Sequence, residues 1–257
     1  MDLGLRDRVA VVVGATSGIG AATAVAFGRA GARVVVAGRR QDAGERVAAE
    51  VRATGADATF TPCDVRREHE VAALMDAAAA RFGRVDCAVN AAGADVNAGI
   101  DGAALADLEA MLATNAVGTF LCLKHELRHM RAGGGGAIVN VGSVSGVVPV
   151  AMQALYGASK AAVSHLTRAA AAEGGPMGVR VNEVLPALLM TEMVRGYFEG
   201  PDAADLGAVT ARMALGRPGE PADGADAVLF LCSARARHIT GASLPVDGGF
   251  LLHNAGA

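Results

Sequence analysis

Tyr156 and Lys160 are the two residues of this chain whose types and spacing best suit proton transfer. They lie four residues apart in the segment LYGASK at 155–160, so on a helix both side chains share one face. A free phenol has a pKa of about 10, too high for acid–base work at neutral pH, and a neighbouring ammonium lowers it. The chain has only two tyrosines. Because such a pair also occurs by chance in many helices, its surroundings decide its role.

A second pattern with possible chemistry is HELRH at 125–129, which matches the zinc-protease motif HExxH. On a helix His125 and His129 share a face, so a metal is geometrically possible. A third ligand is needed, and the next acidic residue downstream is Glu173, beyond a glycine loop and a predicted strand. We therefore predict no metal site here and expect a polar helix face at the surface or in a subunit contact.

A glycine-rich turn, GATSGIG at 14–20, follows an apolar run and precedes a helical pattern. Glycines in such a turn let the backbone approach a pyrophosphate, and the free N–H groups of the helix start favour an anion. The turn predicts a nucleotide site that includes Gly14, Thr16, Ser17, Gly18, Ile19 and Gly20.

The end of the second predicted strand reads Gly38-Arg39-Arg40. In dinucleotide folds an acidic residue at this place binds the ribose hydroxyls and selects NAD. A guanidinium instead pairs with a phosphate through two parallel hydrogen bonds. The sequence favours NADP(H) over NAD(H), with Arg39 on the 2′-phosphate and Arg40 and Ser17 in support. The alternative is a solvated arginine pair.

The elements that must position these residues alternate between strand and helix. Strand patterns occupy 9–13, 33–37, 58–61, 85–90, 137–141, 179–184 and 243–246, and helix patterns occupy 19–30, 41–53, 67–82, 105–130, 156–173 and 222–233. This alternation predicts an α/β fold with a doubly wound parallel sheet of about seven strands and helices on both faces. Ligands should bind at the carboxyl ends of the strands. No linker-like segment divides residues 1–257, so we expect a single domain.

Composition narrows the classes of protein. The net charge of −3 gives no signature of nucleic-acid binding, and no apolar run is long enough for a membrane span. The charged N-terminus does not resemble a signal peptide. Cys63, Cys87, Cys122 and Cys232 lack CxxC spacing, so we expect buried, reduced thiols and a cytoplasmic protein.

Taken together, these segments resemble the short-chain dehydrogenase/reductase family, in its single-domain form, over almost the whole chain. Matches follow in order: the glycine turn, Asp64-Val65, Asn90-Ala91-Ala92-Gly93, Asn115, Ser143 thirteen residues before Tyr156, Pro186-Ala187 with Thr191, and the segments 239–241 and 246–249. The resemblance implies a Rossmann-like fold and an NADP-dependent oxidoreductase similar to ketoreductases.

The resemblance also implies residue roles. Tyr156 would be the general acid in reduction or the base in oxidation, and Lys160 would lower its pKa and hold the nicotinamide ribose. Ser143 would orient the substrate oxygen, and Asn115 would place a water that links Lys160 to solvent. Further cofactor contacts would come from Asp64, Val65, Asn90, Ala91, Ala92, Gly93, Pro186, Ala187, Leu189 and Thr191, besides Tyr156, Lys160 and the glycine turn.

Three residues depart from the family pattern. Val13 and Ala91 remove a hydroxyl and an amide, and Ala187 adds a Cβ near the nicotinamide. None removes a proton-transfer group, so these departures bear on cofactor affinity rather than on the reaction. Glu183 within the sixth strand is also unusual, because a charge there must find a partner or solvent.

The segment 188–212 should form a lid over the substrate, with 94–96 and 144–153 as further walls. Pocket residues would be Ser145, Met152, Gln153, Met190, Met193 and Tyr197. They favour an uncharged, fairly bulky ketone or secondary alcohol, although the apolar members could instead pack on the body or on a neighbouring subunit. By resemblance we expect a homotetramer, with a dimer as the alternative.

Several functions compete with ketone reduction. One is a polyol, sugar or steroid alcohol dehydrogenase working in the oxidative direction, which Arg39 disfavours. Another is a non-enzymatic nucleotide sensor, but such relatives usually lack the tyrosine or the lysine. A cofactor-free lyase would not need the intact glycine turn, and an enoyl reductase normally has wider spacing between tyrosine and lysine.

Overall fold

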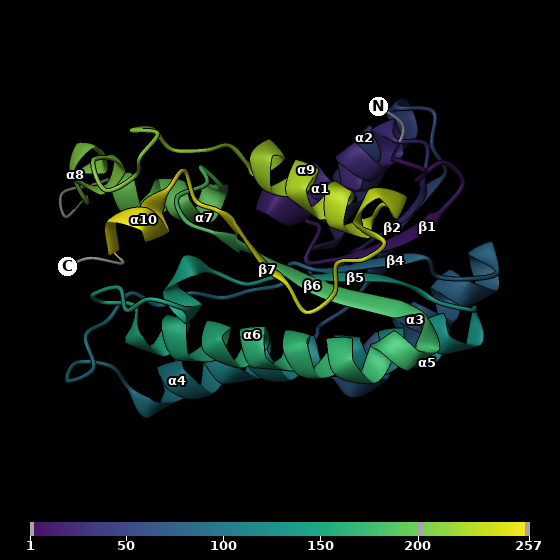
Figure 1. Ribbon diagram of the computed structural model, residues 1–257, viewed down its shortest axis with the longest axis horizontal. Coiled ribbons are helices and arrows are strands. Elements are labelled where there is room, and N and C mark those ends of the chain that lie inside the picture. The colour runs from purple at the N-terminus through teal and green to yellow at the C-terminus, as the bar shows by residue number, and fades with distance from the viewer. Residues whose placement is uncertain (1–2, 200–202, 255–257) are drawn as a thin grey trace.

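The computed structural model, which describes residues 3–199 and 203–254, contains a seven-stranded parallel sheet (Figure 1). The strands lie in the order β3-β2-β1-β4-β5-β6-β7. They are β1 (Val9–Val13), β2 (Arg33–Gly38), β3 (Ala58–Pro62), β4 (Cys87–Asn90), β5 (Gly136–Val141), β6 (Val179–Pro186) and β7 (Ser243–Val246). The order reverses between β1 and β4, and a crevice for ligands forms at such a switch point.

Helices cover both faces of this sheet. On one face lie α1 (Gly18–Arg29), α2 (Gln41–Ala53) and α9 (Pro221–Cys232), and on the other lie α3 (Glu68–Phe82), α5 (Gly118–Ala132) and α6 (Ala154–Gly174) (Figure 1). Side chains of β1 alternate between the two apolar cores that result, with Ala10 and Val12 in one and Val9, Val11 and Val13 in the other. This explains why the strand is a continuous apolar run.

The predicted fold class is therefore confirmed. The predicted bounds of β1, α2 and β7 match those in the structure, and most other bounds differ by one or two residues. The four cysteines are buried and free, as predicted. No helix in the described part of the chain is long and apolar enough to cross a membrane.

The predicted helical region at 105–130 is confirmed, but its middle is a π-helical turn rather than an α-helix. The structure has α4 (Leu105–Met111), a π-helical turn η1 (Leu112–Val117) and then α5. A π-helical turn inserts an extra residue into the helix, and such turns are frequent at functional sites. Here it turns Asn115 fully into the interior.

Short elements absent from the prediction gather beyond the carboxyl ends of the strands. They include α7 (Glu192–Arg195), η4 (Gly196–Phe198), α8 (Leu206–Thr210) and α10 (Phe250–Asn254), with η2 (Val144–Gly146) below them (Figure 1). Two more distant turns, η3 (Gly175–Met177) and η5 (Ala234–Ala236), complete the order. None is long enough to show a periodic pattern of apolar residues.

The HELRH segment also differs from expectation. Glu126 does not lie on a surface face but is completely buried, and its carboxylate accepts a hydrogen bond from the Asn90 side chain at 3.0 Å. The same amide of Asn90 donates to Asn140, which in turn donates to Thr167 at 2.8 Å. This buried polar network ties β4 and β5 to α5 and α6.

The two histidines of that segment do not face a common point. His125 Nε2 lies 3.3 Å from Glu68, and His129 Nε2 lies 3.1 Å from Asp76, a separate residue of α3. Among the described residues no group of three His, Cys, Asp or Glu side chains is placed to hold a metal ion. The segment thus connects α5 to α3.

The buried carboxyl of Glu126 generates a prediction about stability. Burial raises its pKa from 4.5 to about 7, and the Asn90 hydrogen bond opposes that rise. Above pH 4.5 the unfolded chain releases this proton before the folded protein does. The free energy of unfolding therefore falls by up to roughly 3 kcal/mol as the pH rises to about 7. Glu126→Gln removes this loss, because an amide does not ionise. Relative to the parent, its melting temperature should be several degrees higher at pH 8 and nearly equal at pH 5.

The matched control is Glu50→Gln, since Glu50 is exposed on α2. Its melting temperature should track the parent at both pH values in differential scanning calorimetry. A Glu126→Gln variant whose difference from the parent is the same at pH 5 and pH 8 would contradict the ionisation argument.

Candidate active site

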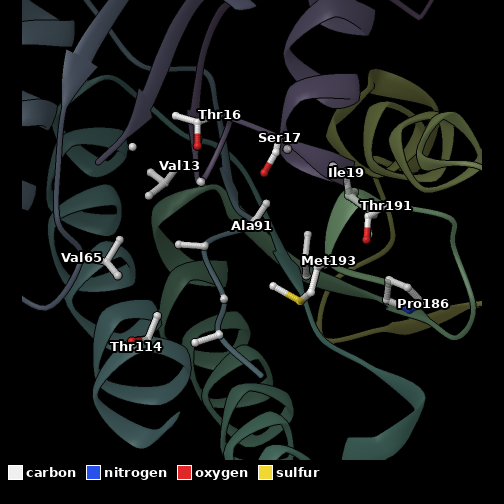
Figure 2. A pocket seen from close by; sticks show the side chains of 18 of the residues that line it. Val13, Thr16, Ser17, Ile19, Val65, Ala91, Thr114, Pro186, Thr191 and Met193 are labelled. Carbon is white, nitrogen blue, oxygen red and sulfur yellow. The ribbon is translucent and has the colours of Figure 1, made fainter. Parts of the chain in front are cut away.

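A cavity of about 500 Å³ opens at the carboxyl edge of the sheet. Figure 2 shows Thr16 and Ser17 at one end, with Val65 and Thr114 along one side and Thr191 and Met193 along the other. Most of the site residues predicted from the sequence line this cavity. They are Gly14, Thr16, Ser17, Gly18, Ile19, Gly20, Arg39, Arg40, Asp64, Val65, Ala91, Ala92, Gly93, Ser143, Tyr156, Lys160, Pro186, Ala187, Leu189, Thr191 and Met193. Residues far apart in the sequence thus meet around one space.

The glycine turn has the close packing that a phosphate-binding turn needs. Gly14 has φ of 78°, and a Cβ there would lie 2.3 Å from the backbone nitrogen of Ala92. A Cβ at Gly20 would lie 2.4 Å from the carbonyl oxygen of Gly14. Ser17, the residue before α1, makes no side-chain cap, and the first turn of α1 holds no acidic residue. The helix start therefore presents uncompensated positive potential to the cavity, which fits a pyrophosphate.

The two arginines after β2 differ in their contacts. Arg40 donates to Ser17 Oγ at 2.6 Å and to Thr16 Oγ1 at 3.2 Å, and it lies 3.8 Å from Glu192 of α7. Arg39 is exposed on the cavity wall, and within the described residues it has no hydrogen bond or ion pair. Its guanidinium is thus available for a ligand, whereas that of Arg40 already braces the glycine turn.

Gly38 leaves no room for the carboxylate that selects NAD. A Cβ at this position would lie 2.7 Å from Cγ2 of Thr16. The side chain of Thr16 therefore fills the space at the end of β2.

Asp64 is held by a residue that the sequence analysis did not identify. Arg66 donates to both carboxylate oxygens, from Nε to Oδ1 at 2.9 Å and from Nη2 to Oδ2 at 2.5 Å. These hydrogen bonds lower the pKa of Asp64 to about 2. Arg66 also lines the cavity, at the edge where Asp64 was predicted to contact the cofactor.

Tyr156, Ser143 and Lys160 come together at the opposite end of the cavity. The Ser143 hydroxyl lies close enough to Tyr156 to act on the pKa of its phenol, which it lowers. Lys160 is 4% exposed and donates from Nζ to the carbonyl oxygen of Val141 at 2.7 Å, while Nζ lies 5.7 Å from the centre of the Tyr156 ring. The tyrosine faces the ligand space and the ammonium lies beneath it.

Lys160 was expected to lower the pKa of Tyr156, and this effect is absent. Burial raises the pKa of Tyr156, Asp95 raises it further, and the Ser143 hydroxyl opposes both. The reason is geometric, because the ammonium is directed to Val141 rather than to the phenol oxygen. Burial lowers the pKa of Lys160 itself to about 8, against the influence of Glu183 and Asp95. In this state the phenol is firmly protonated.

Asn115 does not line the cavity but supports two segments that do. Its Nδ2 donates to the carbonyl of Ala94 and to Ser159 Oγ, each at 2.9 Å, and its Oδ1 accepts from the Ala94 nitrogen at 2.9 Å. Ser159 Oγ donates in turn to the carbonyl of Tyr156 at 2.7 Å. Asn115 therefore joins the loop after β4 to the first turn of α6.

Other predicted positions lie apart from the cavity wall. Asn90 was expected to contact the cofactor, but its buried amide joins the network of Glu126 instead. Ser145 donates to Gln153 at 2.6 Å, and Met152 has φ of 65° and is 52% exposed. Of the six predicted pocket residues, Met193 alone is among those that line the cavity as the described residues define it; the other five are Ser145, Met152, Gln153, Met190 and Tyr197.

One contact near the site was not foreseen. The Tyr197 hydroxyl donates to Asp95 Oδ2 at 2.9 Å and so connects η4 to the loop after β4. Burial raises the pKa of Asp95, which the Tyr197 hydrogen bond opposes, and raises that of Tyr197 to about 12. The only signal for this contact in the sequence is position, because Asp95 lies two residues after the matched segment 90–93.

Comparison with known proteins agrees with this geometry. A family model described as enoyl-(acyl carrier protein) reductase matches residues 14–251. A cis-4-hydroxycyclohexanecarboxylate dehydrogenase of Sinomonas cyclohexanicum is 44% identical over 95% of this chain and 96% of its own. An A-factor type gamma-butyrolactone 1'-reductase of Streptomyces virginiae is 40% identical over 96% and 97%. The chain belongs to the short-chain dehydrogenase/reductase family.

A solved structure supports the same assignment. A putative short-chain alcohol dehydrogenase from Sinorhizobium meliloti 1021 superposes with a TM-score of 0.92 at 34% identity, covering 98% of this chain and 99% of its own. As a member of the short-chain dehydrogenase/reductase family, this protein is an oxidoreductase of CH–OH or C=O groups that uses a nicotinamide nucleotide.

Proposed function

We propose that this protein is an NADP(H)-dependent ketoreductase that converts an uncharged ketone to a secondary alcohol. The observation that carries the proposal is that Ser143, Tyr156 and Lys160 line the same cavity as the glycine turn. A proton donor and a nucleotide-binding turn thus share one space.

The cofactor would lie along the cavity. Its pyrophosphate would meet the start of α1 at Gly18 and Ile19, and its nicotinamide end would lie near Tyr156, Lys160 and Pro186. When bound, NADPH supplies the hydride that reduces the carbonyl carbon. The fit is supported at Gly14, where a Cβ would lie 2.3 Å from the nitrogen of Ala92, so only glycine allows this close turn on the cavity wall.

The residues of the chain would handle the oxygen of the substrate. The Ser143 hydroxyl orients the carbonyl oxygen, and Tyr156 transfers its phenolic proton to that oxygen as negative charge develops there. The cation of Lys160 then stabilises the tyrosinate until a proton returns from solvent. The relay through a water beside Asn115 remains a prediction. Reduction begins with the phenol of Tyr156 in its protonated form, which is the form that burial favours.

Tyr156→Phe tests this mechanism. The variant keeps the ring and removes the proton donor, so turnover with a ketone and NADPH should fall by about 10²–10⁴-fold. Binding of NADPH, followed by its fluorescence, should stay within about threefold of the parent because the hydroxyl is not needed to seat the glycine-turn end. Turnover close to the parent value would remove Tyr156 from the mechanism.

The proposed preference for NADP(H) rests on the end of β2. Arg39 is unpaired there within the described residues, Arg40 and Ser17 lie beside it, and Gly38 has no space for a carboxylate. A 2′-phosphate could accept paired hydrogen bonds from Arg39, which NAD(H) cannot do.

Arg39→Ser tests the preference. The KM for NADPH should rise by about 10–100-fold while that for NADH changes little, since the lost contact is a charge-assisted hydrogen bond. Arg29→Ser, at the exposed last turn of α1, makes the same change in net charge and should leave both constants unchanged. A parent enzyme that prefers NADH would contradict the proposal.

For the substrate, we propose that the charge of Asp95 disfavours anions. Asp95 acts on both Tyr156 and Lys160 and is anchored to Tyr197 of the predicted lid. A carboxylate on the substrate would meet this charge close to the reacting carbonyl. The Sinomonas relative is named for a substrate that carries a carboxylate, so a neutral analogue of similar shape is the informative comparison.

Asp95→Asn, which keeps a hydrogen-bond acceptor for Tyr197, tests this selection. The parent should use 4-methylcyclohexanone with a higher kcat/KM than 4-oxocyclohexanecarboxylate, and the variant should narrow that ratio by about tenfold. Steady-state kinetics at one ionic strength measure both ratios. An unchanged ratio would show that Asp95 does not sense the charge of the substrate.

The oxidative direction is the second candidate, favoured by the dehydrogenase name of the Sinomonas relative. Oxidation needs the tyrosinate, which the raised pKa of Tyr156 opposes until a positively charged nicotinamide is bound. The spacing of three residues between Tyr156 and Lys160 disfavours enoyl reduction, despite the description of the matching family model.

We further propose a lid at 188–212, of which 200–202 lie outside the described residues, and a homotetramer, with a dimer as the smaller alternative. The lid proposal is supported by Thr191 and Met193 on the cavity wall and by the Tyr197–Asp95 contact. Self-association is supported by an apolar groove between α5 and α6, where Phe120 is 48% exposed. Burial of such a groove favours association of subunits.

A further inference from the structure

Glu183 is a fully buried carboxylate in the middle of β6. Its Oε1 accepts from Ser243 of β7 at 2.5 Å and its Oε2 accepts from Ser164 of α6 at 3.0 Å. Both partners are neutral, and within the described residues no cationic side chain lies within ion-pair distance of Glu183. A buried charge without a counter-charge is costly, so its location requires an explanation.

The carboxylate lies directly beneath the catalytic end of the cavity. A Cβ on Gly142 would approach Glu183 Oε2 to 2.7 Å, so this oxygen packs against the backbone at the end of β5. Val141 on one side of Gly142 accepts the hydrogen bond from Lys160, and Ser143 on the other side lines the cavity with Tyr156. Gly142 is thus a point where only glycine fits between the carboxylate and the proton-transfer residues.

Ser164 connects the same carboxylate to the helix of Lys160. It lies four residues after Lys160, one turn along the buried face of α6. Lys160 is itself buried, and its Nζ has a neutral carbonyl as its hydrogen-bond partner. Two buried opposite charges therefore lie on either side of one backbone segment, each bonded to neutral groups.

We propose that Glu183 is a positioning residue whose buried negative charge keeps Lys160 in its ammonium form. The serines hold the carboxylate in place, and the 141–143 segment separates it from the ammonium. This inference deepens the proposed function and rests on it for its consequence in catalysis, but the charge coupling itself is independent of any substrate. Burial lowers the pKa of Lys160 to about 8, and Glu183 is the larger of the two charges that oppose this, ahead of Asp95.

The titratable groups around Lys160 come from four elements. They are Glu183 on β6, Asp95 on the loop after β4, Tyr156 on α6, and Tyr197 on η4, which reaches Lys160 only through Asp95 and Tyr156. Glu183 lies on the core side of Lys160, and Asp95 lies toward the predicted lid. A movement of the predicted lid would therefore leave the charge of Glu183 in place beside Lys160.

The composition of the chain permits a direct test. Lys124 and Lys160 are the only lysines in the sequence, and Lys124 lies on α5 in an ion pair with Glu68. In a Lys124→Arg background, ¹³C-labelled lysine gives a single NMR signal whose pH titration reports Lys160 in the free enzyme. Glu183→Gln in that background should move the midpoint down by about one pH unit from its value with Glu183 present.

Glu126→Gln is the matched control, because Glu126 is an equally buried glutamate that does not act on Lys160. It should leave the Lys160 midpoint unchanged. An equal midpoint with and without Glu183→Gln would overturn the inference, whatever the activity of the enzyme. If the parent enzyme has no ketone reductase activity, the proposed function is overturned but the charge coupling is not.

Kinetics supply a second readout. The alkaline limb of the kcat profile for ketone reduction should shift downward in Glu183→Gln, so turnover falls about fivefold at pH 8 and little at pH 6. A loss of turnover that is equal at both pH values would indicate a structural role only and would contradict the proposal.

If Glu183→Gln does not fold, a thermodynamic cycle with Lys160→Met decides. Without the ammonium the carboxylate has no charge to balance, so Glu183→Gln should cost little or should stabilise the protein in the Lys160→Met background. Restored folding of the double variant supports the coupling. The coupling is overturned if the stability lost in the double variant equals the sum of the losses in the two single variants, or if the double variant still fails to fold.

Discussion

The buried ammonium of Lys160 is the constraint around which the carboxyl edge of the sheet is arranged. A cation that is 4% exposed needs hydrogen-bond acceptors and negative charge nearby. The carbonyl of Val141 meets the first need and so fixes α6 against the end of β5. Tyr156, one turn earlier on α6, is thereby placed beside Ser143, which follows the same strand. The proton-transfer geometry is a consequence of how the lysine is accommodated.

The other end of the cavity depends on a backbone contact rather than on charge. Gly14 and Ala92 approach so closely that no side chain fits at position 14, which brings the turn after β1 against the loop after β4. That loop is then held by Asn115, which also braces the first turn of α6 through Ser159. The nucleotide turn and the catalytic helix are thus connected through one loop. Small displacements of this loop would be felt at both ends of the cavity.

The sequence predicted those features whose signals are local. The buried strand β1 is an unbroken apolar run, and the glycine turn carries its spacing within seven residues. The π-helical turn was missed because one inserted residue hardly changes the apolar periodicity, although it decides where Asn115 points. The burial of Glu126 was missed because its partner Asn90 is 36 residues away. The Tyr197–Asp95 contact, across 102 residues, left no local pattern for the same reason.

The negative charges at the site favour the protonated forms of Tyr156 and Lys160. Asp95 raises the pKa of Tyr156 and of Lys160, and Glu183 acts on Lys160 in the same sense. Both donors therefore hold their protons in the free enzyme, which is the state from which an acid must start. Release of the phenolic proton then requires new positive charge or a strong acceptor, and a carbonyl oxygen that gains negative charge during hydride transfer is such an acceptor. The same charges oppose the tyrosinate with which oxidation begins, and this is one of the grounds on which we propose the reductive direction.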